Sequence, residues 1–340
     1  MSIINNTSYS IFTGNDSLKA IDLNGYSSVG ILVDENTKAH CLAIFLSQCP
    51  VHEPLIIKID SGEKHKTINT CQSIWQQLIT YNFDRHSLLI NLGGGVIGDM
   101  GGFAASCFKR GIDFIQVPTT LLAMVDASIG GKLGVDFSDF KNQIGLFRYP
   151  KCVSIFPDFL KSLDKRQLLS GFAEVIKYAL IQDKYFWQQI KASSLEKIDW
   201  EQVITKCVEL KNKIVNEDPY EDGKRKILNF GHTIGHAIES HYLSQGKDLL
   251  HGEAIALGML VESQLSPISE KEKIEISDCF KRYFSLIDIP PLESLLPFIQ
   301  NDKKNKNKKV QFSLLTKIGQ CKYNLIVTNS QLKDVFKSYI

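Results

Sequence analysis

The sequence predicts an α/β domain with a Rossmann-like parallel sheet over residues 1–157, followed by an all-α domain over residues 158–340. Up to about residue 157, short apolar runs alternate with segments of helical spacing. This alternation is typical of a parallel sheet covered by helices on both faces. From about residue 160, long amphipathic segments follow one another with few strand-like runs, which predicts a helical domain.

The predicted strands are short apolar runs that end at turn-forming or polar residues. They cover residues 29–33, 55–59, 88–92, 114–117 and 152–155. Between the second and third of them, a helix is predicted by the spacing of Ile74, Trp75, Leu78 and Ile79. Ligands of parallel sheets bind at the carboxyl ends of the strands, so polar residues at these ends are candidate contacts.

The second half of the chain is dominated by predicted helices. These cover residues 174–190, 203–216, 228–241, 254–265 and 274–284. The basic, polar segment 301–309 is predicted to be a solvated loop.

Composition and charge narrow the class of protein. Apolar residues make up 44% of the 340 residues and charged residues 22%, as in ordinary globular proteins. The net charge of +2 argues against nucleic acid or an anionic membrane as the partner. No signal peptide and no membrane helix of ~20 apolar residues is predicted. Eight scattered cysteines without a Cys-x-x-Cys pair indicate a reduced, cytoplasmic protein.

Three histidines form a candidate metal site. His232 and His236 are four residues apart and would project from one face of a helix. Residues 244–248 would end that helix and bring His251 near the start of the next. Three imidazoles suit a divalent cation of the zinc type, although two of them could be ordinary helix residues at this spacing.

A charged pair in an apolar run supports the metal hypothesis. Glu174 and Lys177 lie within residues 171–178, which are otherwise mostly apolar. Such side chains are rarely buried unless they are paired or bind a metal. Glu174 is therefore the candidate anionic ligand.

A glycine-rich segment predicts nucleotide binding. Residues 93–102 follow a predicted strand and open a helix, where backbone amides and the helix N-terminus favour a diphosphate. A tight strand–helix connection also needs glycine, so the turn alone is a weak signal. Polar residues at other strand ends favour a dinucleotide, and they are Asp34, Asn36, Ser61–Lys66, Thr119 and Thr120.

Clustered cations predict an anionic substrate. Residues 126–132 and 141–145 place lysines beside glycines, as is typical of contacts to phosphate or carboxylate. Further candidate cations are Arg110, Lys177, Lys211 and Arg225. Each alone could be an ordinary surface residue, and only the set as a whole favours an anionic ligand.

Five motifs together resemble 3-dehydroquinate synthase, the shikimate-pathway member of the sugar phosphate cyclases. They are Gly-Gly-Gly-Val-Ile-Gly-Asp at 93–99, Val-Pro-Thr-Thr-Leu-Leu-Ala-Met-Val-Asp at 117–126, Ala-Glu-Val-Ile-Lys at 173–177, Gly-His-Thr-Ile-Gly-His-Ala at 231–237 and His-Gly-Glu at 251–253. They occur in the family's order over most of the chain. The resemblance implies a dehydroquinate synthase-like fold.

The resemblance also implies the ligands and the residues that bind them. One zinc or cobalt ion per subunit would be held by Glu174, His232 and His251. NAD would be contacted by Asp34, Asn36, Glu63, Lys66, Gly94, Gly95, Val96, Asp99, Thr119, Thr120, Lys141, Phe159 and Ser162. Substrate contacts would be Arg110, Asp126, Lys132, Asn142, Lys211, Arg225, Asn229, His236, His251 and Lys304, with Lys303 as the alternative to Lys304. Catalytic roles fall on Lys132, Lys177, Glu221 and His236. Arg110 would act in the partner's site of a homodimer.

The implied reaction converts 3-deoxy-D-arabino-heptulosonate 7-phosphate to 3-dehydroquinate and phosphate, in aromatic amino acid biosynthesis. It proceeds by transient oxidation by NAD, phosphate elimination, re-reduction and an intramolecular aldol step. The alternatives are a metal-dependent polyol dehydrogenase of the glycerol type, a cyclase forming a valiolone or inosose ring, and a non-catalytic NAD-binding regulator. Departures from the family pattern, including Phe140, Phe172 and a longer interruption at 242–250, remove no candidate ligand.

Overall fold

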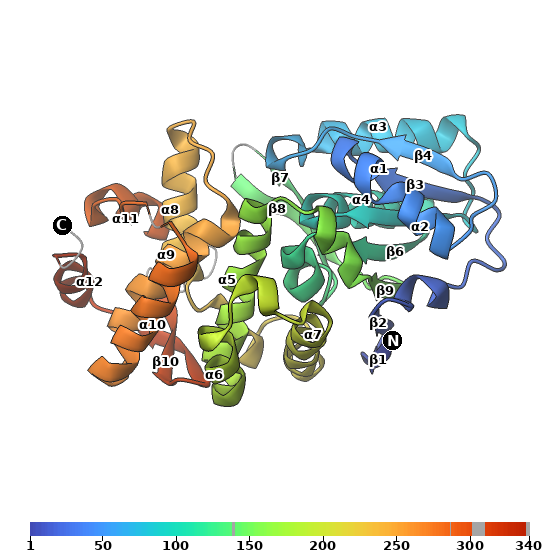
Figure 1. The fold of residues 1–340 in the computed structure, drawn as a ribbon. Helices are drawn as coiled ribbons and strands as arrows, with labels where there is room; N and C mark the ends of the chain where they lie inside the picture. Colours follow the sequence, from blue (N-terminus) through green and yellow to red (C-terminus); the bar gives the residue numbers. More distant parts are fainter. Residues whose placement is uncertain (138–139, 286, 301–309, 338–340) are drawn as a thin grey trace. The chain divides into compact units, whose positions relative to one another are not determined.

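A seven-stranded sheet forms the centre of the first of two units into which the chain divides (Figure 1). The computed structural model describes residues 1–137, 140–285, 287–300 and 310–337. The first unit comprises Met1–Asp164 and Asp199–Asn216, and the second comprises Lys165–Ile198 and Glu217–Ile340. The division therefore differs from the single boundary predicted after residue 157, because one later helix belongs to the first unit.

The sheet of the first unit is parallel apart from one edge pair. Its strands, in spatial order, are β1 (Ser2–Asn5), β2 (Ser10–Thr13), β9 (Cys152–Ile155), β6 (Asp113–Pro118), β5 (Leu88–Gly93), β3 (Val29–Val33) and β4 (Leu55–Lys58). Only β1 and β2 pair antiparallel. The five predicted strands are confirmed to within about a residue at their ends. The short edge pair β1–β2 was not predicted, because neither strand stands out as an apolar run.

Helices and a hairpin complete the first unit. The helices are α1 (Glu35–His40), α2 (Leu42–Gln48), α3 (Ile68–Thr80), α4 (Gly95–Cys107) and α7 (Trp200–Glu217). The hairpin consists of β7 (Lys132–Phe137) and β8 (Phe140–Phe147), which pair antiparallel. Buried apolar side chains of α3, α4, β7 and the central strands form one core, which fixes the glycine-rich start of α4 against the sheet.

Helix α7 is fastened to the first unit by polar contacts. The hydroxyls of Thr205 and Thr13 lie 3.0 Å apart, and Asn212 donates to the Asn5 carbonyl at 3.0 Å. Several apolar residues of α7, including Ile204, Val208 and Ile214, are buried. Its position in the chain, after part of the second unit, could not be inferred from periodicity.

The described residues of the second unit form helices and one hairpin. Its helices are α5 (Lys165–Gln182), α6 (Lys184–Ala192), α8 (His232–Ser244), α9 (His251–Leu265), α10 (Glu270–Tyr283), α11 (Leu292–Gln300) and α12 (Asn329–Phe336). The hairpin joins β10 (Gln311–Lys317) to β11 (Gln320–Ile326) and was not predicted. Among the described residues, no helix combines the length and apolarity required to cross a membrane.

One predicted helix is divided in the structure. The segment predicted over 174–190 is α5 followed by α6, because the Asp183 side chain accepts hydrogen bonds from the amides of Tyr185 and Phe186, each at 3.0 Å. An aspartate in this position caps a new helix rather than continuing the old one. The predicted loop 301–309, with Lys303 and Lys304, lies outside the described residues.

Candidate active site

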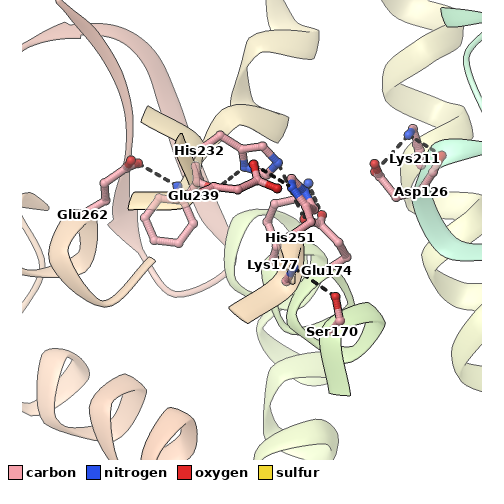
Figure 2. A network of polar contacts seen from close by, with 12 residues as sticks. Asp126, Ser170, Glu174, Lys177, Lys211, His232, Glu239, His251 and Glu262 are labelled. Carbon is pink, nitrogen blue, oxygen red and sulfur yellow. Dashed lines mark hydrogen bonds and ion pairs between the residues drawn. The ribbon is translucent and has the colours of Figure 1, made fainter. Parts of the chain in front are cut away.

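Three helices of the second unit bring a carboxylate and two imidazoles together. Glu174 comes from α5, His232 from the first turn of α8 and His251 from the first turn of α9. The Nε2 atoms of His232 and His251 lie 3.6 Å and 3.8 Å from Oε1 of Glu174. Figure 2 shows these side chains converging, with Lys177 beside Glu174. The convergence predicted from the sequence is therefore present in one unit.

The donor set fits a divalent cation. Glu174 is fully buried, and neither of its carboxylate oxygens accepts a hydrogen bond of ordinary length from the described residues. Lys177 forms an ion pair with Oε2, so Oε1 faces the two imidazoles. Ligands ~2.1 Å from a tetrahedral zinc ion lie about 3.4 Å apart, which is close to the observed separations. A buried oxygen facing two ring nitrogens at this spacing is expected of a metal site.

His236 offers a second possible donor set. Ring nitrogens of His232, His236 and His251 all lie within 4.8 Å of one another. A set of three imidazoles would leave Oε1 of the buried Glu174 carboxylate without a hydrogen bond from the described residues or a metal, and an unsatisfied buried polar atom is costly. The set of Glu174, His232 and His251 therefore remains the better candidate, with His236 adjacent to it.

The start of α8 depends on glycine and on a buried carboxylate. Gly231 has φ +82°, and a Cβ there would overlap Met259 of α9. Glu262 of α9 is buried, and it accepts hydrogen bonds from the amides of Gly231 at 2.6 Å and Ile234 at 3.0 Å. A carboxylate at a helix N-terminus satisfies amides that lack partners within the helix. These contacts hold His232 in place.

Each residue of the His-Gly-Glu motif has a separate role at the start of α9. His251 faces Glu174, and Glu253 accepts a hydrogen bond from the Leu250 amide at 2.9 Å, which satisfies the N-cap amide of the helix. Arg166 of α5 donates to both oxygens of Glu253 at 2.6 Å and 2.8 Å. The Gly252 amide donates to the Ser170 hydroxyl of α5 at 3.0 Å. The motif therefore docks α9 onto α5 beside the candidate metal site.

Gly252→Ala is expected to weaken metal binding through the backbone. A Cβ at Gly252 would overlap the carbonyl of Ser170, so α9 has to move away from α5 and carry His251 with it. Overpacking of this kind costs about 1–3 kcal/mol. Urea unfolding and metal titration would measure the two effects.

The control is Gly25→Ala in the first unit. Gly25 has φ +83° and open space around it, so backbone strain of about 1–2 kcal/mol should leave metal affinity unchanged. Equal metal affinity in the Gly252→Ala variant and the wild type would contradict the docking role.

Two different acceptors face the Nδ1 atoms of the histidines. His232 Nδ1 lies 3.1 Å from the Phe230 carbonyl, and His251 Nδ1 lies 3.6 Å from Oε2 of Glu239. Burial lowers the pKa of His251, but Glu174 and Glu239 outweigh this effect and raise the pKa to about 9. Both rings are thus held with Nε2 towards Glu174.

Three neighbouring strands of the first unit end where the predicted nucleotide contacts lie. Strands β3, β5 and β6 are parallel neighbours, and they are followed by Asp34, Gly94 and Thr119. Gly94 is the N-cap of α4, and Asp34 caps α1 by accepting from the Thr37 amide at 2.7 Å. This edge combines helix N-termini with polar side chains, as a dinucleotide site requires.

The remaining predicted nucleotide contacts belong to the same unit. Gly95, Val96 and Asp99 lie on α4, Asn36 is exposed on α1, and Thr120 follows Thr119. Phe159 and Ser162 lie in the short helix Pro157–Ser162. Lys141 of β8 lies 3.6 Å from Glu63 Oε1.

Lys66 links the glycine-rich helix to the hairpin. Its buried amine donates to Asp99 Oδ2 at 2.7 Å and to Asn142 Oδ1 at 2.6 Å. Burial lowers the pKa of Lys66, but the carboxylates of Asp99 and Glu63 outweigh it and raise the pKa above its ordinary value. The Lys66 amine therefore joins Asp99, a predicted nucleotide contact, to Asn142, a predicted substrate contact.

Asp126 and Lys211 form the second polar cluster of the first unit. Lys211 of α7 donates to the Asp126 carbonyl at 2.6 Å and to its Oδ1 at 2.9 Å (Figure 2). Lys132 is exposed at the start of β7. Arg110 is also exposed, and both Lys109 and Arg110 have positive φ, at 48° and 69°.

The loop before α8 gathers the other predicted residues of the second unit. Asn229 donates to Glu221 Oε1 at 2.6 Å. Arg225 is buried, with one guanidinium nitrogen 2.5 Å from the Pro219 carbonyl. Asp218, which the sequence did not single out, accepts hydrogen bonds from three backbone amides, those of Asp222, Gly223 and Arg225. It shapes the turn that carries Glu221.

Two further residues near the candidate metal site, Glu239 and Glu262, were not predicted from the sequence. Glu239 follows His232 by seven residues, which is about two helical turns and hence the same face, so spacing could have identified it. Glu262 gave no such signal, because its role depends on how α9 packs on α8.

Two family models match most of the chain. A family model described as 3-dehydroquinate synthase N-terminal matches residues 56–170, and one described as 3-dehydroquinate synthase C-terminal matches residues 171–305. A 3-dehydroquinate synthase from Campylobacter concisus is 40% identical over 342 aligned positions, covering 98% of this chain and 95% of the relative.

Two solved structures show the same fold. One is a 2-epi-5-epi-valiolone synthase from Streptomyces hygroscopicus with NAD+ and Zn2+ bound, with a TM-score of 0.86 and 25% identity over 100% of this chain and 98% of that chain. The other is a 2-deoxy-scyllo-inosose synthase complexed with carbaglucose-6-phosphate, NAD+ and Co2+, with a TM-score of 0.84 and 25% identity over 100% of both chains.

Proposed function

The chain belongs to the 3-dehydroquinate synthase family, and on this premise we propose that it converts 3-deoxy-D-arabino-heptulosonate 7-phosphate to 3-dehydroquinate and phosphate. The reaction is a phosphate elimination with ring closure, which makes the enzyme a carbon–oxygen lyase of the shikimate pathway. The observation that carries the proposal is the convergence of Glu174, His232 and His251 beside Lys177. The 40% identity to a dehydroquinate synthase, against 25% to two other cyclases, favours this substrate.

Two cofactors are part of the proposal. Bound NAD supplies reversible hydride transfer, and a bound zinc or cobalt ion supplies Lewis-acid chemistry. Glu174, His232 and His251 would hold the metal. Asp34, Gly94 and Thr119 at the strand ends would hold the nucleotide, together with the other predicted nucleotide contacts of the first unit.

The chain's own residues would position the substrate and move protons. Lys211 fixes the turn that carries Asp126, and Lys66 fixes Asn142. The proposed substrate contacts within the subunit are Asp126, Lys132, Asn142, Lys211, Arg225, Asn229, His236, His251 and Lys304. Lysine and arginine side chains stabilise the negative charge that a leaving phosphate gathers. His236 and Glu221 are the proposed proton-transfer groups, and Lys177 would act beside Glu174.

A homodimer in the cytoplasm completes the proposal. Lys109 and Arg110 both adopt left-handed backbone conformations, which are costly for residues other than glycine and are often found at functional positions. They present Arg110 on the surface of the first unit, and we propose that it acts in the site of the partner subunit.

The test is phosphate release from the heptulosonate 7-phosphate with catalytic NAD, with and without a chelator. We expect one phosphate per substrate and no net NADH, because the cofactor returns to its starting state. Chelation should abolish release, and added zinc or cobalt should restore it. Colorimetric phosphate detection and absorbance at the NADH band would follow both products in the same sample.

Other outcomes would point to different functions. Net NADH from a polyol without phosphate release would indicate a dehydrogenase. Phosphate release only from another sugar phosphate would indicate a different cyclase. NAD binding without turnover of any of these substrates, and without dependence on metal, would indicate a regulator.

A further inference from the structure

We propose that Glu239 is a positioning residue that orients His251 as a metal ligand. The inference rests on the metal site of the proposed function and goes beyond its three ligands. Glu239 lies on α8, two turns after His232, and its Oε2 is 3.6 Å from His251 Nδ1. The other ring nitrogen of His251 faces Glu174. The imidazole therefore lies between two carboxylates, one for each of its nitrogens.

The chemistry of the ring assigns different tasks to these carboxylates. A histidine that binds a metal through Nε2 carries its proton on Nδ1, and this proton needs an acceptor that fixes the tautomer and the ring orientation. Glu239 supplies that acceptor. The separation of 3.6 Å is that of an ion pair rather than a hydrogen bond, and we expect it to shorten when a cation fixes the ring.

The two histidine ligands are held in unequal ways. His232 faces the neutral carbonyl of Phe230, only two residues earlier in the chain. His251 faces a carboxylate from a different helix. A charged acceptor makes the imidazole more basic than a neutral one does. Loss of Glu239 should therefore affect His251 specifically, whereas His232 keeps its own backbone acceptor.

The burial of Glu239 agrees with this role. Only 5% of the residue is exposed, and carboxylates are rarely this buried unless they are paired or hydrogen-bonded. Glu239 also ties α8 to the start of α9 from the side opposite Glu174. The same contact therefore serves packing and ligand orientation, and an experiment has to separate the two.

The experiment measures Co2+ affinity and the cobalt absorption spectrum of the full chain carrying Glu239→Gln or Glu239→Ala. We expect Glu239→Ala to weaken Co2+ binding about 10- to 100-fold and to change the cobalt d–d bands. Glu239→Gln keeps the shape and a neutral acceptor, so its loss should be smaller. NAD affinity should remain unchanged in both variants, because the proposed nucleotide residues belong to the other unit.

The matched control is Glu275→Gln on α10 of the same unit. Glu275 accepts hydrogen bonds from Trp187 and Lys191, so its loss lowers stability without touching the histidines. Unchanged Co2+ affinity and spectrum in both Glu239 variants would overturn the proposal, and so would an equal loss of affinity in the control. Because metal binding is read without turnover, these results are distinct from a failure of the phosphate-release test.

Discussion

Replacing His251 with alanine is expected to abolish metal-dependent turnover while leaving NAD binding largely intact. His251 and Glu174 belong to the second unit, whereas the proposed nucleotide residues belong to the first. Removal of an outer acceptor of a metal ligand costs about 10- to 100-fold, so removal of the ligand itself should cost at least about 100-fold in metal affinity and activity. Metal analysis, NAD titration and phosphate release would measure the three properties on one preparation.

The matched control is His241→Ala. His241 lies on α8 but contacts Gln245 and Tyr242 rather than the site, so its loss should leave metal content and turnover close to wild type. Full activity of a His251→Ala protein verified to be free of metal would contradict the ligand assignment. Loss of NAD binding together with loss of metal would show that the substitution disturbs more than the site.

Lys177→Met should have the second largest effect, and the size of its stability loss should depend on metal. Lys177 and Glu174 are an ion pair with side chains 1% and 0% exposed. Removal of one partner of a buried pair costs about 3–5 kcal/mol, because the other charge stays buried without compensation. The chelated variant should therefore unfold at much lower urea concentration than the chelated wild type.

Addition of metal should reverse part of that loss. A divalent cation compensates the Glu174 carboxylate, and removal of the Lys177 ammonium takes away a like charge that opposes the cation. We therefore expect tighter metal binding, a smaller stability difference with metal present, and lower turnover, since Lys177 is a proposed catalytic residue. Urea unfolding with and without zinc, with turnover assayed in parallel, measures all three.

Lys191→Met is the control for this prediction. Lys191 pairs with Glu275, and both side chains are about a quarter exposed. Because solvent reaches this pair, its loss should cost less than the loss of a fully buried pair, since exposed pairs contribute only about 0–1 kcal/mol, and no effect of metal is expected there. An equal, metal-independent loss in both variants would rule out the proposed competition for Glu174.

The sequence predicted the local features of the fold well. The strands β3, β4 and β9 match their predicted ranges almost residue by residue, because buried parallel strands are short apolar runs with clear ends. The start of α4 after the glycine-rich turn was also predicted, because its signal lies in a few consecutive residues. Helical spacing and a charge in an apolar run made His232, His236, His251 and Glu174 candidate ligands, whereas the choice of Glu174, His232 and His251 came from the family resemblance.

Features that depend on tertiary contacts were missed. The hairpin β7–β8 is not an alternating apolar pattern, and it pairs through closely packed glycines such as Gly134 and Gly145. The role of Glu262 arises only when α9 lies against the start of α8. The assignment of α7 to the first unit depends on contacts such as that between Asn212 and Asn5, which are far apart in the chain.

The interleaved order of the two units has a consequence for synthesis. When the ribosome has released Asp164, every strand of the seven-stranded sheet is present, but α7 is not. Helix α5 then emerges with Glu174 and Lys177 before α8 and α9 exist to enclose them. Domains generally fold as units during translation, so the first unit is completed only once residue 216 has been made. A gene divided after residue 164 would separate α7 from the rest of the first unit, whereas one divided after residue 216 would deliver the first unit whole but remove α5 and α6 from the second.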